Sequence, residues 1–280
     1  MVSKNDNLCA NALFAFLRAT IAACLTLFLS SASVFAQVGG ERAEYRLSAD
    51  GKTFEQYHGP GGLFSVPEGV EKISGAAFMG YDALTSVEIP ASVSSIGGGA
   101  FGACRALAAI NVAEDNAYFR SIDGVLFTKD GKTLIKYPEG KDGENYSVPE
   151  GVQTLFDYAF GKCPSLKSVV LPESATTIGD RAFSECYALS SFAVPENVET
   201  IGGYAFAECS SLTSIVIPEK VSSIGRAAFS RCASLISIEV EEGNANYRSD
   251  DGVLYAKDGK TLIKYPPKRE GERYAILGGA

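Results

Sequence analysis

The most reactive side chains in this sequence are cysteines, and five of its seven cysteines recur in one register. Each follows the phenylalanine of an Ala-Phe segment by three residues: Cys104, Cys163, Cys186, Cys209 and Cys232. In an exported protein such cysteines suggest disulfides. However, side chains stacked in a ladder point in parallel, whereas a disulfide needs converging Cβ vectors. The odd number and the lack of Cys-x-x-Cys pairs also argue against disulfides and zinc. We therefore predict buried, reduced thiols that pack as small apolar groups.

Two further patterns raise the question of catalysis or nucleotide binding. Gly97, Gly99 and Gly102 match the spacing of a dinucleotide-binding loop, but the sister segments at 178–184 and 201–207 show that these glycines belong to a repeated turn. No strand-loop-helix unit of about 30 residues surrounds them. His58 is the single histidine and has no nucleophile motif beside it. The sequence predicts no cofactor, no metal site and no enzymatic activity.

The charge balance excludes one class of partner. Asp and Glu outnumber Lys and Arg by 33 to 25, which gives a net charge of −8. Nucleic-acid binders concentrate positive charge to release phosphate counterions. We therefore expect no nucleic-acid partner.

Residues 1–36 have the pattern of a signal peptide. Lys4 and Arg18 supply positive charge, an apolar run covers 19–29, and the small residues up to Ala36 form a cleavage site before Gln37. The run is shorter than the roughly 20 residues that a transmembrane helix needs, so no transmembrane segment is expected. We predict an exported chain, secreted or held at the cell surface. A minority alternative is a lipoprotein anchored through Cys24.

The elements that position these residues repeat with a period of 23. Phe160, Phe183, Phe206 and Phe229 are spaced by 23 residues, as are Phe78 and Phe101. Two more columns keep step with them: Ile73, Ile96, Ile178, Ile201 and Ile224, and Leu84, Leu107, Leu166, Leu189, Leu212 and Leu235. Such a period predicts stacked coils that bury one continuous core.

Each unit contains one short strand. Leu212, Ile215 and Ile217 alternate with polar residues, as expected of a strand with one buried face. Proline ends the strand at Pro172, Pro195 and Pro218, because proline cannot donate to a ladder. Stacking then places strands side by side in a parallel sheet, about 4.8 Å apart.

The repeated pattern Leu-x-x-Val-x-Ile-Pro-x-x-Val-x-x-Ile-Gly-x-x-Ala-Phe-x-x-Cys-x-x-Leu resembles the BspA-like leucine-rich repeat family over residues 63–280. The resemblance implies an α/β-type leucine-rich-repeat solenoid that is strand-dominated. Members of that family are mostly bacterial surface or secreted proteins associated with attachment to other cells and to matrix proteins. It therefore implies an adhesin-like binding role, with fibronectin, fibrinogen or laminin as protein ligands.

Two longer modules interrupt the period, at 116–138 and 244–266. Asp130-Gly131 and Asp258-Gly259 lie between alternating apolar segments, which is a strong hairpin signal. We predict one β-hairpin module at each place. Residues 49–57 resemble half of a module, and this predicts an N-terminal capping segment at 37–62 between the signal peptide and the solenoid at 63–280.

Two outward columns are candidate ligand contacts. Val170, Ala193 and Val216 form an apolar stripe on adjacent coils, bordered by Glu88 and Asn111 on one side and by Glu239 on the other. Such a stripe suits a contact patch, although ordinary cross-strand packing also explains it.

The second column contains Tyr158, Arg181 and Tyr204, in which the guanidinium can stack between two rings. Tyr and Arg are enriched at binding hot spots, although local structural stacking is the alternative explanation.

A second function class competes with adhesion. The segment 274–279 aligns with 146–151 and begins a coil that stops at Ala280, so it leaves an open edge. Unpaired strand groups at an edge are a template for another chain. This predicts weak self-association through the C-terminal edge, and the alternative function is a self-assembling structural component of the cell surface.

Overall fold

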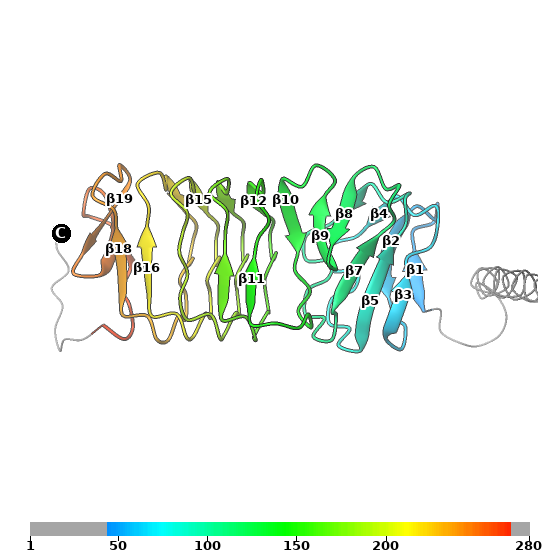
Figure 1. Ribbon diagram of the computed structural model, residues 1–280. Helices are drawn as coiled ribbons and strands as arrows, with labels where there is room; N and C mark the ends of the chain where they lie inside the picture. Colours follow the sequence, from blue (N-terminus) through cyan, green and yellow to red (C-terminus); the bar gives the residue numbers. More distant parts are fainter. Residues whose placement is uncertain (1–43, 270–280) are drawn as a thin grey trace, which may run out of the picture. The chain divides into compact units, whose positions relative to one another are not determined.

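The computed structural model describes residues 44–269 and contains strands and turns there, with no helix in that range. The strands follow one another along a solenoid, from β1 (Tyr45–Leu47) at one end to β19 (Tyr247–Asp250) near the other (Figure 1). The predicted strand-dominated solenoid with 23-residue coils is therefore confirmed. The signal peptide, Cys24 and the C-terminal edge at 274–280 lie outside the described residues. Over the described range, no helix has the length and hydropathy that a membrane crossing requires.

One side of the solenoid, here called the strand face, carries the longer strand of every coil except the one at 190–194. Its strands pair in parallel in three separate sheets, ordered β3-β5-β7, β11-β13 and β16-β18. These strands are β3 (Gly62–Ser65), β5 (Leu84–Ile89), β7 (Ala109–Val112), β11 (Asn145–Ser147), β13 (Ser168–Val170), β16 (Ser214–Ile217) and β18 (Ser237–Val240).

A second set of strands, of two residues each, precedes the Ala-Phe turn and falls into two sheets, one containing β4 and β6 and the other containing β12, β14, β15 and β17. They are β4 (Lys72–Ile73), β6 (Ser95–Ile96), β12 (Thr154–Leu155), β14 (Thr177–Ile178), β15 (Thr200–Ile201) and β17 (Ser223–Ile224). Thr154 pairs with Thr177, Thr177 with Thr200, and Thr200 with Ser223. Each of these pairs joins residues 23 positions apart, so the 23-residue period of the sequence sets the register of these parallel strands.

Each module is a three-stranded antiparallel meander, so the two predicted hairpin modules are confirmed and each has one hairpin more than expected. Their strands are β8 (Phe119–Ile122), β9 (Val125–Thr128) and β10 (Thr133–Lys136), then β19 (Tyr247–Asp250), β20 (Val253–Ala256) and β21 (Leu262–Lys264). In the first module the additional turn, between β8 and β9, is Asp123-Gly124, with φ of 50° and 73°. Two positive φ angles are typical of the type I′ turn that suits a two-residue hairpin.

The start of the described chain resembles half of this arrangement. β1 (Tyr45–Leu47) pairs antiparallel with β2 (Thr53–Tyr57), and β2 pairs in parallel with β4, as β10 does with β12. The segment that resembles half a module in sequence thus holds the corresponding place in the ladder.

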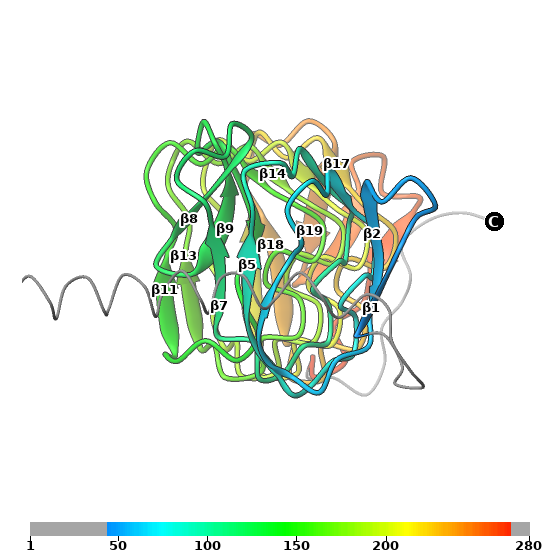
Figure 2. The same cartoon turned by 90° about the vertical axis from the view of Figure 1, so that its right-hand side faces the viewer.

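Viewed along the solenoid, the coils follow one another around a common interior (Figure 2). Stacked aromatic rings fill that interior. Ring centroids in the phenylalanine column lie 5.1 Å apart for Phe160–Phe183 and 5.3 Å for Phe183–Phe206, with nearly parallel planes. Offset stacking of this kind adds to the stabilisation from burial. The column occurs because every coil returns an Ala-Phe pair to the same place.

The first module divides the interior into two cores. Val125, Leu126 and Phe127 of β9 are all fully buried. Leu126 packs in the core of the preceding coils, whereas Val125 and Phe127 pack in the core of the following coils. A strand with both faces buried needs a continuous apolar run instead of alternation.

Candidate functional site

The stripe predicted from the sequence lies on the strand face. Ser147 pairs with Val170, and Val216 pairs with Glu239, so these positions share the outward column. The side chains of Val170 and Val216 are 59% and 50% exposed, and Ala193 between them is also exposed. The structure therefore brings Val170, Ala193 and Val216 onto one outward surface.

The strand face is interrupted at the middle of this stripe. Residues 190–194 form no strand, although the corresponding residues of the flanking coils form β13 and β16. Ser190 bonds to both neighbouring coils at 3.4 Å, compared with 2.7 Å for the equivalent bond from Lys167 N–H to Glu144 C=O. Within the described range, the backbone groups of 191–194 make no hydrogen bond.

A single large side chain explains the interruption. Phe192 occupies the buried position that Val169 and Ile215 hold in the flanking coils. Its ring lies between two members of the phenylalanine column, with centroids 4.8 Å from Phe183 and 4.9 Å from Phe206. A close-packed interior accommodates a larger ring only by shifting its surroundings, and here the backbone of the coil has left the ladder.

Other coils also carry an aromatic residue at this buried position. Phe64 in β3 and the partly buried Tyr146 in β11 hold the corresponding place, but each of these strands is the first of its sheet and must match a single neighbour. Phe192 lies between two strands, so its coil would have to match both at once. This difference in position accounts for the loss of pairing at 191–194 and not at β3 or β11.

A groove of about 350 Å³ follows the interruption. It runs between β13 and the unpaired segment, and its lining is formed by residues 168–171, 173, 191 and 193–196. Val170 and Ala193 supply apolar surface, and Glu173 and Glu196 supply carboxylates that are exposed. Neither carboxylate belongs to an ion pair in the part of the chain that the structure describes. The groove is thus apolar along the strands and acidic at one end.

The second predicted column forms a stack on another side of the coils. The guanidinium carbon of Arg181 lies 5.4 Å from the ring centroid of Tyr158 and 5.0 Å from that of Tyr204. Its Nη1 also donates to the hydroxyl of Tyr158 at 2.7 Å. All three residues have φ between 53° and 60°, and Ala227 has φ of 55° at the same position of the next coil. The coil geometry imposes this left-handed conformation, so the conformation itself is no sign of a binding site.

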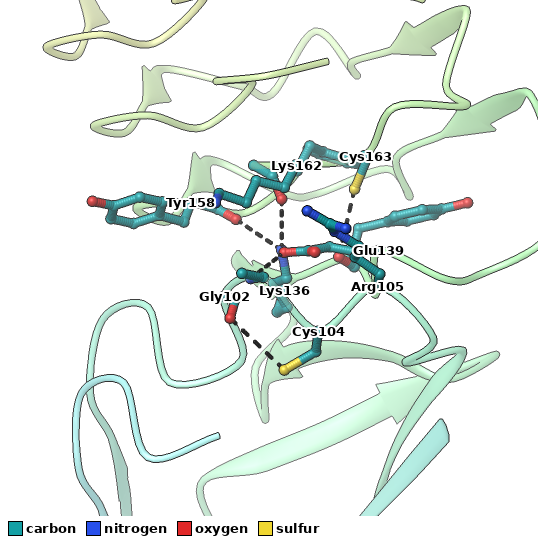
Figure 3. Close-up of polar contacts among 12 residues, drawn as sticks. Gly102, Cys104, Arg105, Lys136, Glu139, Tyr158, Lys162 and Cys163 are labelled. Carbon is teal, nitrogen blue, oxygen red and sulfur yellow. Dashed lines mark hydrogen bonds and ion pairs between the residues drawn. The ribbon is translucent and has the colours of Figure 1, made fainter. Parts of the chain in front are cut away.

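A buried ion pair joins the coils on either side of the first module (Figure 3). Lys136 Nζ lies 3.5 Å from Glu139 Oε1 and donates to the carbonyls of Tyr158 and Gly161. Glu139 Oε1 accepts the N–H of Ala103 from the preceding coil at 2.7 Å. Burial raises the pKa of Glu139 despite the opposing charge of Lys136. Because both side chains are buried, their place is in joining the coils and not in contact with a ligand.

The cysteine ladder is made of free, buried thiols, as predicted. The Sγ of Cys186, Cys209 and Cys232 each lies 3.1 Å from the carbonyl oxygen of the phenylalanine 26 residues earlier. Each thiol therefore donates a weak hydrogen bond to the preceding coil instead of meeting another sulfur. His58 Nδ1 lies 3.2 Å from the hydroxyl of Tyr81 and is exposed.

The groove and the buried pair were not predicted from the sequence. Phe192 was the available signal for the groove, because it is an aromatic residue with a β-branched residue on each side in its column, Val169 in the coil before and Ile215 in the coil after. The two acidic residues of the groove occur at corresponding places, since each directly follows a proline of the repeat, Pro172 or Pro195.

Comparison with known proteins gives one family. The family model described as "BspA type Leucine rich repeat region" matches residues 62–141 and 137–250, in six copies. A search of curated proteins finds no match.

Solved structures share the fold. The pneumococcal vaccine antigen PcpA is 26% identical with a TM-score of 0.59, over 69% of this chain and 54% of that one. A leucine-rich repeat protein from Eubacterium ventriosum is 23% identical with a TM-score of 0.56, over 74% of this chain and 61% of that one. This chain therefore spans little more than half the length of these solved proteins.

Proposed function

The chain belongs to the BspA-type leucine-rich repeat family, and from this premise we propose that it is an exported binding protein and not an enzyme. It attaches to a protein ligand through the strand face, in the manner of an adhesin. The observation that carries this proposal is the exposed apolar stripe of Val170, Ala193 and Val216. Exposed apolar surface of this kind is typical of protein contact sites.

Two further features support the proposal. The pattern of residues 1–36 favours export, and the solved relative with the 26% identity is a vaccine antigen. The family resemblance favours fibronectin, fibrinogen or laminin as the ligand, at the surface of a host or another cell.

A binding experiment with a charge placed in the stripe tests this function. The chain from residue 37 to 280 is applied to immobilised fibronectin, fibrinogen and laminin, alongside its Val216→Asp variant. The control is Ile236→Asp, because Ile236 is also 50% exposed but lies outside the column. Each substitution is expected to change the free energy of unfolding by about 0.5 kcal/mol, as surface changes do.

The expected result is binding of at least one matrix protein, loss of that binding in Val216→Asp, and binding by Ile236→Asp equal to that of the parent chain. If Val216→Asp binds as well as the parent chain, the stripe is not the site, and the stack of Tyr158, Arg181 and Tyr204 is tested next. If no matrix protein binds while sedimentation velocity shows the chain associating with itself, the structural-component function replaces adhesion.

A further inference from the structure

Unpaired backbone groups at 191–194 are the least ordinary feature of the strand face. Within each sheet of this face, neighbouring coils satisfy one another through ladder bonds, as β16 and β18 do over four residue pairs. At 191–194 the N–H and C=O groups have no such partner among the described residues. An extended chain is the ligand whose own regularly spaced N–H and C=O groups match this arrangement, as in recognition by strand addition.

The groove beside this segment sets the side-chain chemistry of such a ligand. Ala193 holds the position that valine holds at 170 and 216, so the surface is lower between two exposed valines. A β-branched side chain of moderate size fills such a depression and buries apolar surface.

The negative charge at one end of the groove favours a ligand with a basic residue at that end. Glu173 and Glu196 line the same end of the groove, both are exposed, and neither is paired with a cation in the described chain. A lysine or arginine at that end of the ligand meets two carboxylates, and arrangements of this kind give specificity and faster association.

We propose that the groove beside 191–196 seats an extended polypeptide segment with β-branched side chains and a basic residue at one end. The segment pairs its main chain with the free backbone groups of 191–194 and places its basic residue between Glu173 and Glu196. This inference rests on the proposed function and assigns the kind of segment that the protein ligand presents.

Hydrogen–deuterium exchange of the free protein tests the first step. The amides of 191–194 are expected to exchange at least tenfold faster than those amides of β16 that face β18, because only the latter are paired in a ladder. Equal protection in the two segments would mean that the ladder is continuous, and the proposal would fall.

Peptide probes test the second step. The probe is an acetylated and amidated peptide of alternating valine and threonine that ends in two lysines, together with the same peptide in reverse sequence order. One of the two is expected, at millimolar concentration, to slow the exchange of 191–194 at least threefold. Versions with glutamate in place of lysine, or with N-methylated main-chain amides, are expected to have no effect.

Variants of the groove provide the controls. Ala193→Val fills the depression, and Glu173→Gln with Glu196→Gln removes its charge, so each is expected to abolish the slowing of exchange that the peptide causes. Glu88→Gln is the matched control, because Glu88 is exposed on the same face in another coil. If neither lysine probe protects 191–194, or if Ala193→Val leaves the protection unchanged, the proposal is wrong.

The outcomes separate this inference from the proposed function. Loss of matrix-protein binding in Val216→Asp, without any protection of 191–194 by either peptide, supports a contact surface and overturns strand addition. Protection of 191–194 by a lysine peptide, without binding to any of the three matrix proteins, supports strand addition and overturns the choice of ligand.

Discussion

Burial governs the chemistry of the individual cysteines. The five thiols lie inside the solenoid, one coil apart or separated by the first module. Burial raises the pKa of Cys104 and Cys232 to about 11 and the pKa of Cys163 to about 12. It also raises the pKa of Cys186 and Cys209. The thiolate is the reactive form of cysteine. These thiols are therefore protected from chemical reaction both because they are buried and because they stay protonated.

Thiol labelling of the chain from residue 37 to 280 checks this. At pH 8 the native protein is expected to label at least about tenfold more slowly than the denatured protein, which should show five thiols.

The raised pKa values of the folded-state thiols also make stability depend on pH. Unfolded thiols lose protons near pH 9 while folded ones keep them, so the free energy of unfolding should fall as pH rises from 9 to 11. Mass spectrometry that finds two disulfides would contradict the prediction that the five thiols are free.

Sequence reasoning succeeds for residues whose role repeats and fails for residues that act once. The cysteine column is predictable because each member has the same neighbours one coil away. Phe192 is a single departure, and its effect depends on the two phenylalanine rings that enclose it. Phe192 contacts one ring nine positions earlier and another fourteen positions later. Neither separation matches the 23-residue period, so the sequence pattern gives no sign of these contacts.

At the scale of elements, the modules were recognised by their turn residues, but their attachment was not. Asn116 is fully buried and makes four hydrogen bonds: its Nδ2 donates to the carbonyls of Pro90 and Val93, and its Oδ1 accepts the N–H of Tyr118 and Phe119. Asn244 repeats this arrangement in the second module. Asparagine at the start of both modules was visible in the sequence, but its partners lie 23 and 26 residues earlier.

The pair of Lys136 and Glu139 fastens the first module to both of its neighbouring coils. Replacing Lys136 with Met should lower the free energy of unfolding by about 3–5 kcal/mol, because it leaves a buried carboxylate uncompensated. The double variant Lys136→Met, Glu139→Met should lose only about 1–2 kcal/mol, chiefly from the unpaired N–H of Ala103. Urea unfolding of the single and double variants measures the difference.

The second module supplies the control and pH supplies a further check. Lys264 corresponds to Lys136, but Pro267 stands where Glu139 would be, so Lys264→Met should change stability by only about 0.5 kcal/mol. The pKa of Glu139 is already raised by burial, and loss of Lys136 raises it further. A group with a raised folded-state pKa is least destabilising when protonated, so Lys136→Met should be less harmful at pH 5 than at pH 7. Equal effects at the two pH values would mean that Glu139 is not charged in the parent protein.

At the scale of the whole molecule, the fold was predictable because a solenoid repeats one set of local contacts. Each coil contacts its neighbours, and the 23-residue period fixes which residues meet. The groove was not predictable in the same way, because it exists where one coil fails to pair. In this chain the 23-residue period sets the general surface, and the departure from that period at Phe192 sets the groove.

Removal of the departing coil as a unit tests this view of the molecule. Deleting residues 177–199 removes one period, including Phe192, and joins Thr176 to Thr200 so that the sequence Ala-Thr-Thr-Ile-Gly is restored at the junction. β13 then lies next to β16, and Phe160 next to Phe206. The shortened chain should unfold cooperatively in urea with a lower m-value, since less surface is exposed, and with a lower free energy of unfolding, since one interface between coils is lost. Its segments 168–170 and 214–217 should both be protected from exchange, and the lysine peptides should no longer bind.

Deletion of 177–188 alone is the control, because half a period puts every column out of register and should abolish the cooperative transition. A shortened chain without 177–199 that fails to fold would show that the coils are not interchangeable, and that the coil containing Phe192 is needed to join the two sheets on either side of it.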